Sequence, residues 1–118
     1  MLKRIKFIAV PALDQSRALD FYSKKLGFKI FTDQAMGEDR WIELQIPGAE
    51  TLLVLLKAKN PGNGNTPALV LVADNVKGTY EELKGRGIEF TEPPTKAPWG
   101  EHATFRDSEG NLVMIGTA

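Results

Sequence analysis

The chain has 118 residues, 42% of them hydrophobic and 25% charged, which is typical of one globular domain with a core of its own. Its 15 Lys and Arg residues balance 15 Asp and Glu residues, so bulk charge favours neither nucleic acid nor an anionic membrane as a partner. The lack of cysteine excludes disulfides, thiolate metal sites and cysteine nucleophiles. No long apolar stretch follows Met1, so we expect neither a signal peptide nor a membrane span, and a cytoplasmic location is the default.

The first half of the chain is predicted to form a strand, a helix and three further strands. Residues 5–10 are apolar and partly β-branched, which predicts a buried strand that Pro11 ends. Asp14 or Ser16 can cap the following helix, and Gly27 lies where a left-handed C-terminal cap is needed. The helix stripe consists of Ala18, Leu19, Tyr22 and Leu26, strands are predicted at 28–32, 41–46 and 52–56, and the polar stretch 33–39 is predicted to be a loop.

The same pattern begins again after residues 59–66, which are rich in Asn, Gly and Pro and are predicted to be a linker. Asp74 or Asn75 can cap a second helix, which ends at Gly87. The helix stripe consists of Val76, Tyr80 and Leu83; strands are predicted at 68–72, 88–91, 103–106 and 112–115, and a stiff loop contains Pro93, Pro94 and Pro98.

The two halves match at a constant offset of 60 residues. The offset pairs strand ends, helix caps and C-cap glycines: Val10 with Val70, Asp14 with Asp74, Gly27 with Gly87 and Leu52 with Leu112. This predicts a duplicated βαβββ module, residues 1–58 and 67–118, within a single domain 1–118. The predicted fold class is α+β, with the two modules forming a curled mixed sheet, or half-barrel cup, and the helices on its convex side.

Strand alternation predicts which side chains line that cup. In the first strand Ile8 and Val10 are expected to face the helix, which leaves Ile5, Phe7 and Ala9 in the cup. By the repeat, the other residues expected in the cup are Pro67, Leu69 and Leu71, with Leu52, Val54 and Leu56 in the fourth strand and Leu112 and Met114 in the last.

Two motifs resemble a known superfamily. Asp14, Phe21-Tyr22 and Leu26-Gly27-Phe28 resemble the "D…FY…LGF" signature of the vicinal-oxygen-chelate superfamily, which contains glyoxalases, bleomycin resistance proteins and extradiol dioxygenases. Trp99-Gly100 followed by the segment 105–111 resembles its "pWG…F.DPDGN" ending. The resemblance covers nearly the whole chain and includes the duplication.

Enzymes of that superfamily hold a divalent metal in the cup through His, Gln and Glu side chains. The resemblance places three of the four ligand positions on Phe7, Pro67 and Met114, and the repeat then places the fourth on Val54, with Leu55 as the alternative. None of these side chains is an adequate donor for such a cation, since the Met thioether is weak and soft. The resemblance therefore implies a member without metal ligands, and no cofactor is expected.

A few polar and aromatic residues remain as candidates for chemistry. His102, the sole histidine, and Glu43 are candidate catalytic residues, although each is also compatible with a role at a strand end or on a solvated face. Trp41 is equally well explained by packing, whereas Trp99 lies in a loop and can line the mouth of a pocket. The predicted ligand-binding residues are Phe7, Leu52, Val54, Leu69, Trp99, His102 and Met114.

Three functions are compatible with this pattern. The first is a metal-free protein that holds a small apolar or aromatic molecule in the cup, as the antibiotic-sequestering proteins of the superfamily do. The second is a glyoxalase-like lyase, isomerase or dioxygenase whose metal ligands lie at atypical positions such as Glu43, His102 and Asp107. The third is a structural or regulatory dimer whose cup is filled by its own side chains. A homodimer is expected in any case, because a second copy can cover the open strand edges.

Overall fold

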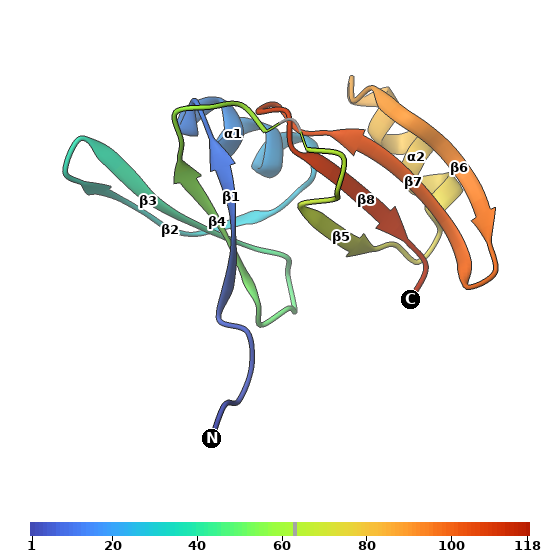
Figure 1. Cartoon of the computed structure of the whole chain (residues 1–118), viewed down its shortest axis with the longest axis horizontal. Helices are drawn as coiled ribbons and strands as arrows, with labels where there is room; N and C mark the ends of the chain where they lie inside the picture. The colour runs from blue at the N-terminus through green and yellow to red at the C-terminus, as the bar shows by residue number, and fades with distance from the viewer. Residues whose placement is uncertain (63) are drawn as a thin grey trace. The chain divides into compact units, whose positions relative to one another are not determined.

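The computed structural model of the chain describes residues 1–62 and 64–118 (Figure 1). It divides into two compact units, Met1–Pro61 and Gly62–Ala118, here called the first and second unit. Each unit contains a four-stranded mixed sheet and one helical segment, so the predicted α+β class with two repeated modules is confirmed. Among the described residues no helix has the length and apolar character needed to cross a membrane.

The first unit has the strand order β1-β4-β3-β2, in which β1 runs parallel to β4 and the other neighbours are antiparallel. The Asp14 side chain caps the helix by accepting from the backbone N–H of Arg17. The elements are β1 (Phe7–Ala12), α1 (Gln15–Asp20), the π-helical turn η1 (Phe21–Lys25), β2 (Lys29–Met36), β3 (Asp39–Gln45) and β4 (Leu52–Lys57).

The second unit repeats this arrangement with the order β5-β8-β7-β6, in which β5 is parallel to β8. Here the cap is Asn75, whose side chain accepts from the backbone N–H of Gly78 at 2.9 Å. The elements are β5 (Leu69–Val72), α2 (Val76–Gly85), β6 (Phe90–Ala97), β7 (Gly100–Arg106) and β8 (Leu112–Gly116).

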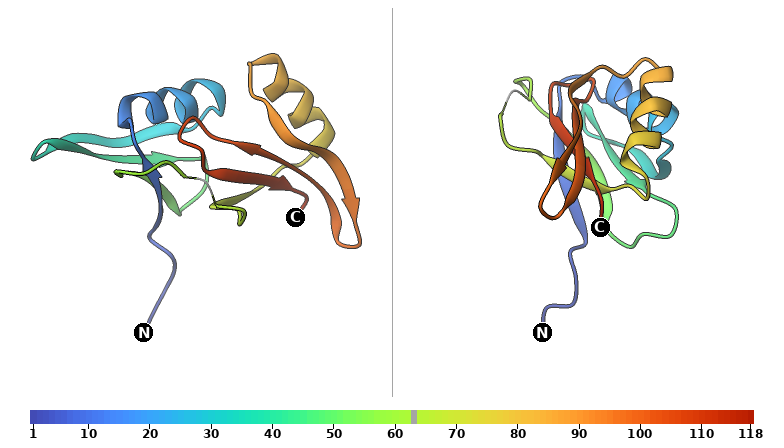
Figure 2. Two further views of the ribbon diagram at one scale, coloured as in Figure 1. Left: turned by 45° about the horizontal axis from the view of Figure 1, so that its top comes forward. Right: turned by 90° about the vertical axis from the view of Figure 1, so that its right-hand side faces the viewer.

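One face of each sheet packs against the helix of its own unit (Figure 2). The alternating residues of the strands supply this core: Val10, Ile42, Leu44 and Leu55 in the first unit, and Ala103, Phe105, Val113 and Ile115 in the second, are all buried. The opposite face, which points away from the helix, is called the open face below. Because cross-strand partners point to the same side, the strand register assigns every other residue to one of the two faces.

The helical segment of the first unit is one residue longer than that of the second, and this changes the offset between the two halves of the repeat. The caps Asp14 and Asn75 are 61 residues apart, whereas Gly27 and Gly87, which both have positive φ, are 60 apart. The turn η1 absorbs the extra residue: the N–H of Leu26 donates to the carbonyl of Phe21, five residues back. The predicted constant offset of 60 is therefore wrong for the strands that precede the helices.

This one-residue slip inverts the predicted faces of β5, since side chains alternate along a strand. Leu69 pairs with Val113 and is buried on the helix side, so the prediction that Leu69 faces the same side as Met114 is wrong. Leu71 is the counterpart of Val10 in the corrected repeat. Like Leu69, it lies on the helix side of the second unit, where it pairs with Ile115. Val70 instead pairs with Met114 on the open face and is 64% exposed.

Three prolines and a polar stretch lie inside strands, although the sequence predicted loops at 33–39 and at Pro93-Pro94 and a strand end at Pro11. The stretch 33–39 is mostly strand, because β2 continues to Met36 and β3 begins at Asp39. Pro11 lies within β1, and Pro93 and Pro94 lie within β6. Both β1 and β6 are at the edge of their sheet. On the outer side of an edge strand there is no neighbouring strand to accept a hydrogen bond, so a proline, which has no N–H, is tolerated there.

The predicted linker 59–66 contains the boundary between the units, and its residue Asn63 lies outside the described residues. Gly62 packs closely on the β7–β8 turn, donating its N–H to the carbonyl of Glu109 at 2.9 Å. A Cβ at Gly62 would lie 2.0 Å from Oδ1 of Asn111, so only glycine allows this approach.

The Asp107 carboxylate orders the β7–β8 turn. Its Oδ1 accepts from the N–H groups of Glu109 and Asn111, both at 2.8 Å. The side chains of Asp107, Glu109 and Asn111 are buried. The segment that resembles the family ending therefore forms an ordered turn, and its polar side chains are used within that turn.

Candidate ligand-binding site

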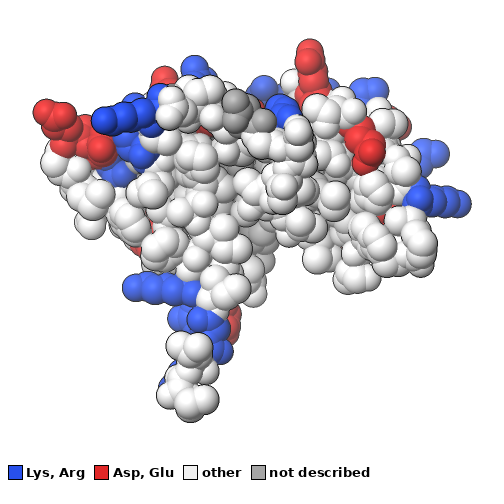
Figure 3. All heavy atoms as spheres, in the orientation of Figure 1, with Lys and Arg blue, Asp and Glu red and all other residues white. Residues whose placement is uncertain are grey.

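The open face of the second unit carries a pocket of about 330 Å³. Met114 and Thr104 are cross-strand partners at its centre, with Thr104 6% exposed and Met114 partly exposed. Pro67 and Leu112 extend the apolar lining. In the view of Figures 1 and 3 the strands of this unit lie in front of α2, and the surface over β5 and β8 carries few charged side chains.

The polar side of the pocket comes from β6 and the segment ahead of β5. Thr91, Glu92 and Asn65 line it. The hydroxyl of Thr91 donates to the carbonyl of Thr104 at 3.2 Å and so is already used by the backbone. The Glu92 carboxylate remains as the charged group of the pocket, and its side chain is 47% exposed.

His102 lies next to Glu92. The strand register pairs Glu92 with Thr104 and Thr95 with His102, and an irregularity between Glu92 and Thr95 accommodates the two prolines. Nδ1 of His102 lies 3.0 Å from Oε1 of Glu92. The two atoms are close enough for a hydrogen bond but are not aligned for one, and Nδ1 is buried without a hydrogen-bond partner among residues 1–62 and 64–118.

Trp99 covers the other side of His102. Its indole stacks on the imidazole with ring centroids 5.5 Å apart and an interplanar angle of 21°. A Cβ at Gly116 would come within 3.2 Å of the outer edge of the indole, so the ring also contacts β8 at a position that has no side chain. Trp99 is 55% exposed and is therefore available to a ligand on its outer side.

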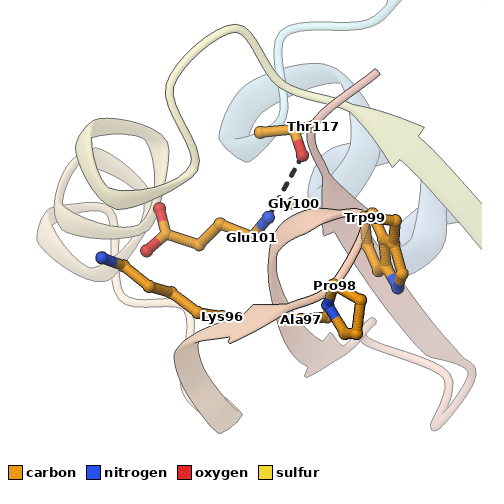
Figure 4. A pocket seen from close by; sticks show the side chains of 7 residues that line it. All are labelled: Lys96, Ala97, Pro98, Trp99, Gly100, Glu101 and Thr117. Atoms are coloured by element: carbon orange, nitrogen blue, oxygen red, sulfur yellow. Dashed lines mark hydrogen bonds between the residues drawn. The ribbon is translucent and has the colours of Figure 1, made fainter.

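A second hollow, of about 500 Å³, surrounds the β6–β7 turn next to Trp99 (Figure 4). Figure 4 shows Trp99 and Pro98 on one side of the turn and the side chains of Lys96 and Glu101 on the other. The N–H of Glu101 donates to Oγ1 of Thr117 at 3.1 Å, which ties the turn to the C-terminal segment.

The open face of the first unit holds the remaining predicted residues. Val54 is fully buried at its centre and pairs with Glu43, which is partly exposed. Leu52 is buried beside Phe7, and the Phe7 ring meets Trp41 edge-on at 5.7 Å. Trp41 and Glu43 thus share the open face, which the sequence left undecided.

The residues at the family's metal positions do not fit a metal ion. Phe7, Val54 and Met114 lie on open faces and offer hydrocarbon or a thioether, and the corrected repeat replaces Pro67 by Ala68 as the counterpart of Phe7. His102 and Glu92 make only a pair, and no group of three His, Asp or Glu side chains suited to a metal is found in the described residues. No metal-dependent step is derived for this site.

Glu92 and Thr104 are pocket residues that the sequence did not single out. Glu92 precedes Pro93-Pro94, and this segment was predicted to be a loop, so no alternation placed its side chain. A lone carboxylate before two prolines carries no sequence signal of a pocket. Thr104 could be found only from its register partner Met114.

Comparison with known proteins identifies the family. Residues 4–115 match the model of the Glyoxalase/Bleomycin resistance protein/Dioxygenase superfamily. The chain belongs to this superfamily. It is 38% identical over 118 residues to the uncharacterized protein YetH of Bacillus subtilis (strain 168), with 98% of each chain covered.

Two solved structures from the comparison share the fold at similar identity. UcmS2 has a TM-score of 0.88 and 32% identity over 100% of both chains. TnmS3, described as an antibiotic binding protein from Streptomyces sp. CB03234, has a TM-score of 0.84 and 30% identity, covering 98% of this chain and 96% of its own.

Proposed function

We propose that this superfamily member is a metal-free binding protein for a small apolar or aromatic molecule. The observation that carries the proposal is the chemistry of the open faces. Where metal-dependent relatives need His, Gln or Glu, this chain has Phe7, Val54 and Met114. These side chains lack the donors that would replace the water around a cation, and they favour apolar contacts. The description of TnmS3 as an antibiotic binding protein supports the same class of function.

The proposed binding residues are those that line the open faces. Met114 is the proposed centre of contact in the second unit, and His102, which pairs with Gly116, and Trp99, which stacks on His102, extend the proposed contact along the same face. In the first unit the proposed residues are Phe7, which is exposed, and Leu52 and Val54, which are buried on the same face. Leu69 is not included, because it is buried against the helix side. Pockets for small ligands combine such an apolar lining with a few polar groups.

The proposal extends to the assembly and location of the protein. We infer a homodimer, because β1, β2, β5 and β6 are sheet edges within their units and several carry exposed apolar side chains. A cytoplasmic location is proposed from the sequence alone.

A metal measurement and a ligand screen test the function together. The full chain is purified without chelators, its metal content is measured, and it is screened by thermal shift against small aromatic and aliphatic molecules. We expect substoichiometric metal and stabilisation by aromatic compounds, with Trp99→Ala and Met114→Ala reducing the shift and Met36→Ala, on the exposed end of β2, leaving it unchanged. A stoichiometric metal bound through open-face residues would contradict the proposal and favour the enzyme.

A further inference from the structure

We propose that the pocket of the second unit selects molecules that carry a hydrogen-bond donor, a hydroxyl or an amine, which docks on the carboxylate of Glu92. This inference rests on the proposed function and specifies its ligand class. It follows from the position of Glu92, the one charged group among the residues that line the pocket.

Glu92 is the one charged acceptor among the residues that line the pocket. The other polar lining residues, Asn65, Thr91 and Thr104, are neutral, and the Thr91 hydroxyl is already used by a backbone carbonyl; the apolar lining offers only the weak Met114 thioether. Glu92 has two carboxylate oxygens, of which one lies beside His102. An ionised carboxylate accepts hydrogen bonds and donates none, so its complement in a ligand is a donor.

The surroundings of Glu92 strengthen this selection. Pro67, Leu112 and Met114 form the apolar lining of the same pocket, so a ligand that covers them displaces water there, and a hydrogen bond to the carboxylate is stronger where water is displaced. A ligand with an anionic group would bring two negative charges together, which such a pocket penalises. Glu92 and His102 alone are too few ligands for a divalent metal, so the pair is better suited to an organic donor.

His102 acts as a positioning residue in this scheme. It lies 3.0 Å from one carboxylate oxygen, is only 16% exposed and is held in place by the Trp99 indole. Its imidazole limits where the carboxylate of Glu92 can lie, and Glu92 lines the pocket from that position. The double proline after Glu92 restricts the backbone on that side.

Matched naphthalene derivatives test the proposal on the full chain at pH 7. Neutral 2-naphthol and 2-methoxynaphthalene have nearly the same apolar surface, but only the first carries a donor. We expect 2-naphthol and 2-(aminomethyl)naphthalene to bind about tenfold more tightly than 2-methoxynaphthalene, as one charge-assisted hydrogen bond implies. The anion 2-naphthoate is expected to bind more weakly than 2-methoxynaphthalene. Affinities are measured by quenching of tryptophan fluorescence and by calorimetry.

Variants assign the preference to Glu92. In Glu92→Gln, which keeps the shape but removes the charge, we expect the donor preference to fall to roughly threefold or less. Glu89→Gln, the same change at an exposed residue just before β6, should leave the preference intact. His102→Gln should reduce the ratio of the affinity for 2-naphthol to that for 2-methoxynaphthalene, a ratio that a uniform loss of affinity or of stability would not change.

The outcomes separate this inference from the function on which it rests. Equal binding of 2-naphthol and 2-methoxynaphthalene, or an unchanged preference in Glu92→Gln, would overturn the donor selection and leave a purely apolar binding protein. Failure of every naphthalene derivative to bind would count against the proposed function as well.

Discussion

The exposure of Met114 distinguishes the open face from the packed core. It lies between two fully buried neighbours, Val113 and Ile115, yet its own side chain is partly exposed in a pocket. Removing its side chain therefore leaves little new cavity, because the space is already open to water. The residue contributes more to contact with a ligand than to the packed core.

We expect Met114→Ala to lower the free energy of unfolding by no more than about 1 kcal/mol, below the roughly 2–5 kcal/mol of a fully buried methionine. Val113→Ala, at the adjacent buried position, should cost more, and Met36→Ala, at an exposed position, should cost almost nothing. Urea unfolding of the three variants measures these differences. A large loss for Met114→Ala without any change in affinity for a screened ligand would mean that the cup is filled by side chains and that the third function holds.

Residue by residue, the site was only partly predictable from the sequence. Met114 was assigned to the cup from the resemblance and the repeat, and it lies on the open face as the register partner of Thr104. Leu69 was assigned to the wrong face because the extra residue of η1 shifts the register by one, and hydrophobic periodicity does not reveal a π-turn. Glu92 was missed because two prolines concealed a strand at the sheet edge.

At the scale of elements, the helix caps show where the repeat changes register. The sequence allowed Asp74 or Asn75 as the cap of α2, and the Asn75 side chain is the one that accepts from the first turn. We expect Asn75→Ala to lower the free energy of unfolding by about 1 kcal/mol and Asp74→Ala to have little effect. Chemical denaturation of both variants measures this. A larger loss for Asp74→Ala than for Asn75→Ala would mean that Asp74 is the cap, and the two caps would then be 60 residues apart.

The helices and the central strands were largely predictable, since each carries a strong pattern. The stripes through Ala18 and Tyr22, and through Val76 and Leu83, are buried as their spacing requires, and Gly27 and Gly87 have the positive φ of a left-handed cap. The edge strands β2 and β6 were predicted too short, because one face and one edge meet solvent there and the residues that extend them are mostly polar or proline.

The β2–β3 hairpin has a pH-dependent link between its strands. Nε and Nη2 of Arg40 donate to the Asp33 carboxylate at 3.1 and 2.6 Å, and this hydrogen bonding lowers the pKa of Asp33 below its ordinary value. A lowered folded-state pKa stabilises the protein above the unfolded-state pKa, and that contribution is lost as the pH falls through the folded-state pKa.

We therefore expect Asp33→Asn to be less stable than the natural protein at pH 7 and the difference to shrink as the pH falls below about 4. Asp39→Asn, at an exposed carboxylate of the same hairpin, serves as the control. Urea unfolding at pH 7, 5 and 3 gives the comparison. A difference that persists unchanged at pH 3 would show that the ion pair does not contribute through ionisation of Asp33.

At the scale of the whole molecule, the exposed apolar side chains favour association of two chains. Val70 and Val72, on the edge strand β5, are 64% and 69% exposed, and β-branched side chains on an open edge promote pairing with another strand. A symmetric dimer is the simplest assembly that covers the same edge on both copies.

We expect sedimentation to give twice the 13.0 kDa chain mass at micromolar concentration. Val72→Lys should shift the protein toward monomer, because it places a charge on an apolar contact, whereas Gln34→Lys, at an exposed polar position of the edge strand β2, should not. Circular dichroism of both variants confirms that they remain folded. A monomer at every micromolar concentration would refute the dimer. A dimer that dissociates only in Gln34→Lys would place the contact on β2, because a charge there weakens association only if that strand is buried between the two copies.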